Sequence, residues 1–279
     1  MSPSASATPT CPLAGHDASQ LTVVTRLAGA DDLLSVGSTV YVSLVTSGRI
    51  VAINAGGSTR VVASGLSTPE GMVDAGGSQI YVAEQGPNRV DRLDLASGHI
   101  TPIASFPNPS HGEGIDSIHA DASTPPQILV PDSPSGSLYR LNPITSQSVR
   151  IGSGLGRPVD AMWWRGPGQE AGGYVLADEQ LGLVFAGAAG FLGPSVGRVA
   201  TASIADDVLT DSGNHIIVTS IGNRAVYRYE PSSSHLTLLA GGFREPQGLA
   251  FARDGSLLIS DDIAGVVYRL PAACIPAAA

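Results

Sequence analysis

The chain carries the stretch EPQGLAFARDGSLLISDDIAGVVYRL at residues 245–270. It contains three short apolar runs, EPQGLAF (245–251), SLLISD (256–261) and GVVYRL (265–270), separated by turns that contain glycine. Runs of this length joined by short glycine-containing turns are typical of β-hairpins. The stretch therefore predicts a meander of antiparallel strands.

The same pattern recurs along the chain. The last run has counterparts in GRIVAIN (48–54), NRVDRLDL (88–95), GSLYRLNP (136–143), LGLVFAG (181–187) and NRAVYRYEP (223–231). The run before it has counterparts in TVYVS (39–43), QIYVAE (79–84), QILVPD (127–132), GYVLAD (173–178) and HIIVTS (215–220). No segment keeps the 3.6-residue apolar period of an amphipathic helix, so we expect almost no helix.

Six units with room for four strands each predict an all-β fold, a six-bladed β-propeller with four antiparallel strands per blade. The last unit stops after its third strand, at Leu270, and LTVVTRLAG (21–29) resembles the fourth strand LTLLAGG (236–242) of the preceding unit. We therefore expect an N-terminal strand to close the last blade. Residues 1–15 are predicted to be a flexible tail and residues 16–279 a single propeller. A β-sandwich or a solenoid is the alternative.

The two cysteines, Cys11 and Cys274, lie beside this predicted seam. We expect them to form a disulfide; the alternative is two unrelated free thiols. A disulfide implies an oxidising compartment, so the protein is predicted to be secreted or extracytoplasmic. Residues 1–15 lack a basic region followed by an apolar one, so the export signal is expected to be absent from this chain.

Composition excludes several kinds of chemistry. All 15 basic residues are arginine, which leaves no lysine for a Schiff base, a pyridoxal anchor or a P-loop. The net charge of −9 argues against nucleic acid and anionic membranes as partners. No apolar run approaches 18 residues, so no membrane span is predicted. We expect a monomer that binds a small neutral molecule.

Acidic residues recur at one position of the repeat, at the start of the first strand of each unit. The predicted set is Asp31, Glu70, Asp116, Asp160, Asp206 and Gln247. The first strands of a propeller surround its central channel. The end of the second strand faces the same mouth and adds Glu84, Asp132, Asp178 and Asp261. Nine of the 24 acidic residues are thus predicted to gather at one channel mouth.

So many like charges cannot all stay ionised in a partly dry channel without compensation. Neither repeat position holds an arginine, so a divalent cation is the expected partner. Oxygen ligands in an irregular cage favour Ca²⁺ over zinc. The alternative is a hydrated acidic pore in which some carboxyls are protonated or bonded to backbone amides.

Two phrases, TPEGMVDAGGSQIYVAE (68–84) and EPQGLAFARDGSLLISDD (245–262), carry a resemblance to the senescence-marker/gluconolactonase group and the wider NHL-type six-bladed propellers. The resemblance extends over all six units. In that group Glu, Asn and Asp side chains at the starts of first strands hold a divalent ion. The resemblance implies that Glu70, Asp116, Asp160 and Asp206 are metal ligands. The group's Asn is not matched, because the only amide of the set is Gln247.

Other residues are candidates for chemistry or packing. His111, in the loop entering the Asp116 strand, is expected to overlook the mouth as a candidate base or to make a local hydrogen bond. His119 is expected to pack between blades. Of Trp163 and Trp164, one is expected to pack between blades and the other to wall a pocket.

The function expected first is a Ca²⁺-dependent hydrolase of a lactone or similar small cyclic ester. Asp206 or Asp160 would activate water, with His111 as the other candidate base. Asp31, Gln247, Trp163 and the four second-strand acids would contact the substrate. The alternatives are a non-catalytic propeller with a structural metal that binds a ligand or a protein, and a metal-assisted lyase of the virginiamycin B lyase type.

Overall fold

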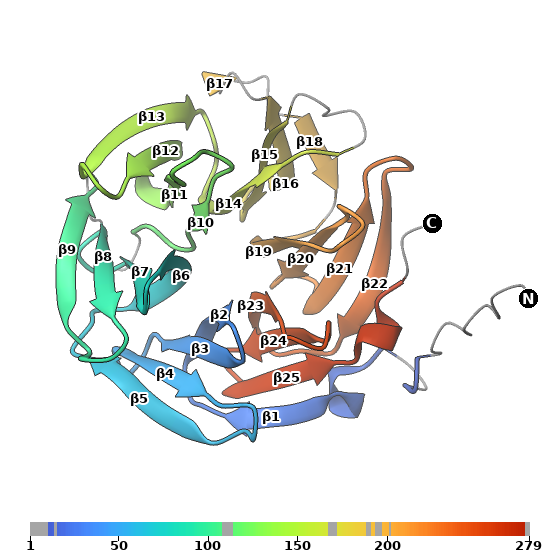
Figure 1. Ribbon diagram of the computed structural model, residues 1–279. Coiled ribbons are helices and arrows are strands. Elements are labelled where there is room, and N and C mark those ends of the chain that lie inside the picture. Colours follow the sequence, from blue (N-terminus) through green and yellow to red (C-terminus); the bar gives the residue numbers. More distant parts are fainter. Residues whose placement is uncertain are drawn as a thin grey trace, which may run out of the picture.

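The computed structural model describes residues 11–13, 16–107, 114–166, 172–187, 191–192, 197–200 and 202–276. Within these residues, six β-sheets stand like blades around a common axis (Figure 1). Helical structure in the same residues is confined to three short 3-10 turns, η1 (Ala18–Gln20), η2 (Ser133–Ser135) and η3 (Ala272–Cys274). The predicted six-bladed β-propeller is confirmed.

Each blade has four antiparallel strands, called first to fourth in order of their distance from the axis, with the first strand innermost. The first strands are β2 (Ala30–Val36), β6 (Pro69–Gly76), β10 (His119–Ala120), β14 (Pro158–Trp164), β19 (Ala205–Thr210) and β23 (Pro246–Phe251). The second strands are β3 (Thr39–Leu44), β7 (Gln79–Glu84), β11 (Ile128–Asp132), β15 (Gly173–Asp178), β20 (Ile216–Ser220) and β24 (Leu257–Asp261). The third strands are β4 (Arg49–Ile53), β8 (Arg89–Asp94), β12 (Ser137–Asn142), β16 (Gly182–Gly187), β21 (Ala225–Glu230) and β25 (Val266–Leu270). The fourth strands are β5 (Thr59–Ser64), β9 (Ile100–Ser105), β13 (Gln147–Ser153), β18 (Gly197–Ala200), β22 (His235–Gly241) and β1 (Thr22–Arg26). A short strand, β17 (Phe191–Leu192), adds to β13 in parallel.

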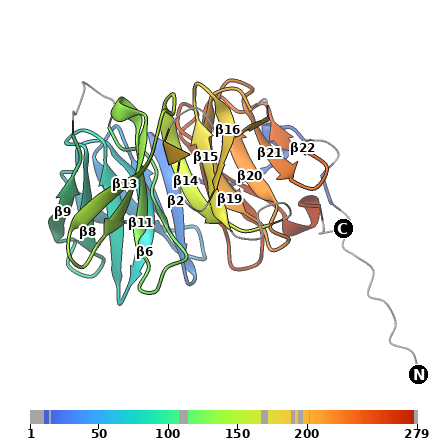
Figure 2. The ribbon, with the colours of Figure 1, turned by 90° about the horizontal axis from the view of Figure 1, so that it is seen from above.

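The ring is closed by strands from both ends of the described chain. β1 pairs antiparallel with β25 and completes the blade of β23 and β24, as the sequence predicted. Cys11 and Cys274 form a disulfide beside this pairing, with a sequence separation of 263 residues. The first and last described segments therefore lie on the same side of the ring (Figure 2).

The hydrophobic core lies between the blades. Six clusters of buried side chains each join two neighbouring blades; the cluster between the last two blades, for example, includes Leu239, Leu249 and Leu270. Alternate residues of each strand face opposite sides of its sheet, so a blade contributes to the clusters on both sides. Each blade is therefore stabilised mainly by its two neighbours.

Close to the axis, glycine permits adjacent first strands to approach each other. A Cβ on Gly71 would lie 2.4 Å from the Cα of Ser117, and a Cβ on Gly248 would lie 2.6 Å from the Cα of Asp32. Both distances are shorter than any real contact and involve backbone atoms. Only glycine fits these two positions without a shift of a first strand.

We expect the Gly248→Ala substitution to reduce the free energy of unfolding by about 2 kcal/mol or more, because backbone must move to relieve the overlap. The matched control is Gly187→Ala, since a Cβ there meets nothing within 4 Å. Urea unfolding of both variants measures the difference. Equal stability of the two variants would contradict the close approach of β23 and β2.

Replacing both Cys11 and Cys274 by serine should lower the free energy of unfolding by up to about 5 kcal/mol, because the bond closes a very long loop in the unfolded chain. Urea unfolding with and without dithiothreitol provides the measurement. Dithiothreitol should destabilise the parent protein and leave the double variant unchanged. A parent midpoint insensitive to the reductant would show that the bond does not hold the ring together.

Candidate functional site

Strand pairing defines which residues of the six blades are equivalent. Pro158 pairs with Asp178 at the end of the second strand, as Ala30 pairs with Leu44 and Pro69 with Glu84. The next residue in each blade defines the upper ring: Asp31, Glu70, Asp116, Val159, Asp206 and Gln247. The residue after that defines the lower ring: Asp32, Gly71, Ser117, Asp160, Asp207 and Gly248.

The predicted membership of Asp160 in the first set is therefore wrong. In its blade Val159 holds the upper position, and Asp160 lies in the lower ring with Asp32 and Asp207. The repeats were aligned so that their acidic residues coincide, which placed Asp160 level with Asp31 and Asp206. The strand register instead places Asp160 one residue later in its first strand than Asp31 and Asp206 are in theirs. Because successive side chains point in different directions, one residue changes what the carboxyl contacts.

The other predicted carboxylates of the upper ring do come together. The carboxyl groups of Asp31 and Glu70 lie close enough to interact, and burial together with the charge of Asp31 raises the pKa of Glu70. Asp31, Glu70 and Asp206 are buried, and Asp116 is largely so. The Gln247 amide faces Asp206; with its nitrogen toward that carboxyl, it donates to Oδ2 at 2.5 Å and to Oδ1 at 3.1 Å. Four blades thus supply carboxyls to one buried ring.

Burial and mutual repulsion make ionisation of this ring unfavourable. Burial, reinforced by the charges of the neighbouring acids, raises the pKa of Asp31, Glu70 and Asp206 well above its ordinary value. Burial also raises the pKa of Asp116 to about 7, although the nearby Arg157 opposes the shift. In the protein alone, these carboxyls therefore hold protons at pH values where free acids would have lost them.

The structure adds two residues that the sequence analysis missed at this ring. Arg157 lies just before β14 and places Nη2 3.8 Å from Asp116 Oδ2, and its Nη1 forms an ion pair with Glu179. Neither repeat position holds an arginine, as predicted, but Arg157 reaches the acids from the loop before the first strand. One arginine faces five carboxyls, so the excess of negative charge remains.

The second-strand acids have a different role from the one predicted. Asp178 accepts hydrogen bonds from the backbone N–H groups of Gly156 and Arg157, at 2.9 and 3.1 Å, and from two N–H groups of its own turn. Asp261 likewise accepts from the N–H groups of Arg244 and Glu245, at 2.8 and 3.0 Å. These buried carboxylates fasten the loop that leads into the first strand. They are committed to protein donors and do not line an open mouth.

Glu84 and Asp132, the other two second-strand acids, also accept hydrogen bonds from protein groups. Glu84 accepts from the N–H of Ser67 at 2.8 Å and pairs with Arg89 at 3.0 Å. Asp132 is fully buried, accepts from the Asn88 side chain at 3.2 Å and bonds Ser135 in its own turn. Each of these four second-strand acids thus has hydrogen-bond donors from the protein, and their predicted contact with a substrate stays a prediction.

The lower ring ties the first strands to one another. Asp160 is fully buried; its Oδ2 accepts the backbone N–H of Val208 in β19 at 2.9 Å, and its Oδ1 accepts the N–H of Ala161 at 2.7 Å. Asp207 repeats this contact one blade later, with Oδ2 2.5 Å from the backbone nitrogen of Leu249 in β23. At the axis no adjacent strand among the described residues offers an acceptor to these two backbone N–H groups, and a side-chain carboxyl group takes that place.

His119 also belongs to this layer. Its Nδ1 lies 2.9 Å from Asp160 Oδ1, so it packs between two blades as predicted. Burial would lower the pKa of His119, but the Asp160 carboxylate outweighs it and raises that pKa. Conversely, burial opposes ionisation of Asp160, yet the His119 charge prevails and lowers the pKa of Asp160. Each charge therefore favours the other, and the two side chains form an ion pair when His119 is protonated.

Potential ligand atoms of His119, Asp160 and Asp207 lie within 4.8 Å of one another, which is close enough for one metal ion to bridge. Both oxygens of Asp160 are already hydrogen-bond acceptors, however, and Asp207 bonds to β23.

The lower ring also had a sign in the sequence. Two of its acids, Asp32 and Asp207, are the second members of the paired acids in ADDL (30–33) and ADDV (205–208).

Two further candidates can be placed. Trp163 packs at the interface between two blades, with its ring 5.2 Å from that of Tyr174, and Trp164 is buried in the next interface. Neither tryptophan borders the upper ring, so the expected pocket wall is not formed by them. His111 lies outside the described residues, and its predicted role stays a prediction.

No protein-family model matches the chain, and no curated protein matches it by sequence. In the described residues, no helix is long and apolar enough to cross a membrane.

Solved structures do match over nearly the whole chain. A gluconolactonase from Xanthomonas campestris is 17% identical, with a TM-score of 0.73 and coverage of 96% of both chains. A calcium-binding regucalcin from Agrobacterium tumefaciens is 15% identical, with a TM-score of 0.69 and coverage of 89% of this chain and 92% of that one. The virginiamycin B lyase of Staphylococcus aureus is 12% identical, with a TM-score of 0.62 and coverage of 86% and 80%. The resemblance to gluconolactonase-type propellers is confirmed for the fold.

The raised pKa values predict how stability depends on pH without divalent ions. Between pH 4 and 7 the folded protein holds protons on Asp116 and the other ring acids that the unfolded chain has released. The free energy of unfolding must therefore fall as pH rises through this window, and protonation of His119 acts in the same direction. Urea unfolding in EDTA from pH 5 to pH 8 should show a loss of about 2 to 4 kcal/mol.

Two variants serve as controls for this slope. Asp116→Asn should flatten it, whereas Asp254→Asn, which changes an exposed carboxylate far from the axis, should leave it unaltered. Stability that is constant or increases from pH 5 to pH 8 would contradict the buried, protonated ring.

Proposed function

We propose that the protein is a divalent-metal-dependent hydrolase of a lactone or similar small cyclic ester, with Ca²⁺ as the metal and the upper ring as the active site. One observation carries the proposal: the carboxyls of Asp31, Glu70, Asp116 and Asp206 converge in a buried ring, and Arg157, the one arginine that the described residues place beside it, cannot balance four carboxylates once they ionise. The shared fold with a gluconolactonase and a calcium-binding regucalcin supports it.

The donor set fits a hard cation. The upper ring offers carboxylate oxygens from four blades and no histidine or cysteine, which is the ligand chemistry that Ca²⁺ prefers. The carboxyls that would hold the ion are Asp31, Glu70, Asp116 and Asp206. When bound, such an ion supplies Lewis-acid polarisation of an ester carbonyl and stabilises the charge that develops on its oxygen.

The side chains of the ring supply the remaining steps. Asp206, held by the Gln247 amide, is placed to take a proton from a water molecule whose oxygen attacks the carbonyl carbon. The ring C–O bond then breaks, and the same proton passes to the leaving alkoxide, which gives a hydroxy acid. Asp116 and Glu179 take no part in this proton transfer, because both are paired with Arg157. The acidic surroundings favour a neutral substrate and repel the anionic product.

We also propose an oxidising location outside the cytoplasm. The Cys11–Cys274 disulfide supports it, because such bonds persist in oxidising compartments and are rare in the cytosol.

The proposed function predicts that Ca²⁺ raises the melting temperature at pH 8 far more than at pH 5, because protons compete with the ion for the same oxygens. In a lactone panel, Asp206→Asn should reduce kcat/KM at least ~100-fold, the usual contribution of a general base. The Ca²⁺-induced thermal shift should also decrease in this variant. Asp254→Asn is the matched control and should retain both properties.

Each other result excludes a part of the proposal. No Ca²⁺-dependent shift would exclude the metal site. A shift without hydrolysis of any lactone would assign the ion a structural role in a binding protein. A product of unchanged mass, in place of one that has gained a water, would indicate elimination, which is the lyase alternative.

A further inference from the structure

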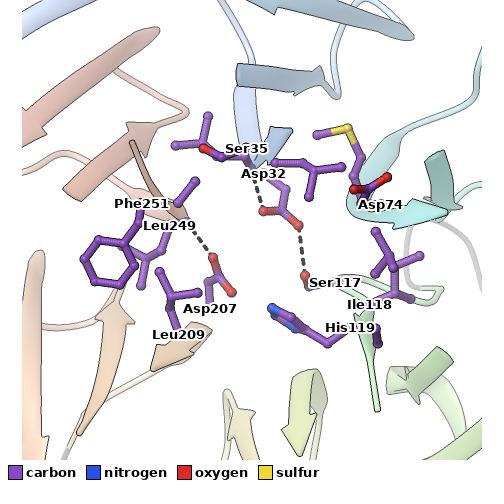
Figure 3. Close-up of a pocket in the computed structure, with 16 residues that line it drawn as sticks. Asp32, Ser35, Asp74, Ser117, Ile118, His119, Asp207, Leu209, Leu249 and Phe251 are labelled. Atoms are coloured by element: carbon purple, nitrogen blue, oxygen red, sulfur yellow. Dashed lines mark hydrogen bonds between the residues drawn. The ribbon is translucent and has the colours of Figure 1, made fainter. Parts of the chain in front are cut away.

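We propose that this protein has a second, independent ligand site below the upper ring, which binds a small organic cation made of an ammonium group and an apolar body. The site is a cavity of about 360 Å³ around the lower ring (Figure 3). That volume lies at the lower end of the range of small-molecule pockets, roughly 300–1,000 Å³.

The cavity is built by five of the six first-strand segments and is separate from the proposed active site. Its lining begins at the lower ring and continues toward the ends of these strands, as far as Ser35, Ala120 and Phe251. None of the upper-ring residues lines it. The two sites therefore lie one after the other along the axis, with the lower ring between them.

The walls of the cavity are apolar. Leu34, Val73, Ile118, Leu249 and Phe251 are among the residues that line it, and most of its lining residues are apolar. An aliphatic or aromatic body of a ligand would gain free energy by leaving water for this surface. The Phe251 ring adds a surface on which an aromatic group or a cation can pack.

Polar groups converge on the cavity from three blades (Figure 3). Asp32 directs its carboxylate inward; Oδ1 accepts the Leu33 N–H at 2.6 Å and Oδ2 accepts the Ser117 hydroxyl at 2.8 Å. These bonds fix the carboxylate in position and leave further lone pairs, since each oxygen can accept more than one hydrogen bond. Asp207 and His119 face Asp32 across the cavity.

The charges of the lining favour a cation. Three carboxylic acids, Asp32, Asp74 and Asp207, line the cavity, although burial raises the pKa of Asp207 well above its ordinary value; among the described residues, neither an arginine nor a lysine lines it. The only basic group is His119, and it is already paired with Asp160 behind the wall. A ligand ammonium would balance this excess and donate hydrogen bonds to Asp32, and Asp74 at the exposed rim would attract it.

The same lining disfavours a metal ion. A hydrated ion needs oxygen or nitrogen ligands on most sides, whereas the walls are largely hydrocarbon. Asp160 is committed to β19 and to His119, and Asp207 to β23. The Ser35 hydroxyl, in a residue that lines the cavity, is buried without a hydrogen-bond partner among the described residues.

Isothermal titration of the whole protein in EDTA tests the site, because the chelator keeps the upper ring free of metal. The probe is 2-phenylethylammonium, and 2-phenylethanol is its uncharged match. We expect one ammonium bound per chain and binding of the alcohol at least ~10-fold weaker, as is typical when a hydrogen bond to a charged group is lost.

Matched variants separate the two sites. Asp32→Asn should weaken ammonium binding at least ~10-fold and preserve the Ca²⁺-induced thermal shift, which also shows that the variant is folded. Asp31→Asn changes the adjacent carboxyl in the upper ring and should leave ammonium binding within ~2-fold. Ala120→Phe, at the exposed rim, should reduce binding of both probes because the larger side chain narrows the cavity.

Several results would overturn the proposal. These are equal affinity for the ammonium and the alcohol, binding that responds to Asp31→Asn and not to Asp32→Asn, and no binding at millimolar probe. Stoichiometric binding of Zn²⁺ or Mn²⁺ that is lost in His119→Gln would show that the layer is a metal site. None of these results bears on lactone hydrolysis at the upper ring, so the two proposals fail separately.

Discussion

The structure depends on one constraint, which is that six strands meet at an axis where no further strand can pair with them. Their inward edges carry backbone N–H groups that would be costly to bury without acceptors. The protein satisfies several of them between blades. The N–H of Gly71 donates to the Asp116 carbonyl at 3.2 Å and that of Ser117 to the Val159 carbonyl at 2.8 Å. Elsewhere the acceptors are the Asp160 and Asp207 carboxylates.

This constraint explains why acidic residues gather at the axis in two layers, the upper and the lower ring, whose carboxyls have different partners. A carboxylate in the lower ring reaches the next strand and becomes part of the backbone hydrogen-bond network. A carboxyl in the upper ring, one residue earlier, meets other carboxyls, the Gln247 amide and, at Asp116, the side chains of Arg157 and Gln85. The raised pKa values of Asp31 and Glu70 show how unfavourable that meeting is without a cation. The difference between an acid that bonds the backbone of the next strand and one that faces other carboxyls is therefore one residue along the strand.

The same step marks the limit of what the sequence could predict. Strand and turn patterns repeat six times, so the blades and the N-terminal closing strand were predictable from local composition. The upper ring was predictable where an alignment of the acidic residues agrees with the strand register, as at Asp31, Glu70 and Asp206. At Asp160 it was not, because the register is set by the pairing of Pro158 with Asp178, which is a contact between strands. Arg157 escaped notice because Asp178 positions its loop through hydrogen bonds that leave no sequence pattern.

The pairing of β1 with β25 has a consequence for how the protein is made. Five blades consist of strands from one continuous stretch and can form as each stretch leaves the ribosome. The remaining blade cannot, because its outermost strand is synthesised first and its other three strands last. Residues 22–26 must stay unpaired, with their edge exposed, until synthesis has reached β25. The Cys11–Cys274 bond can form only after that moment, so oxidation seals a ring that is already complete.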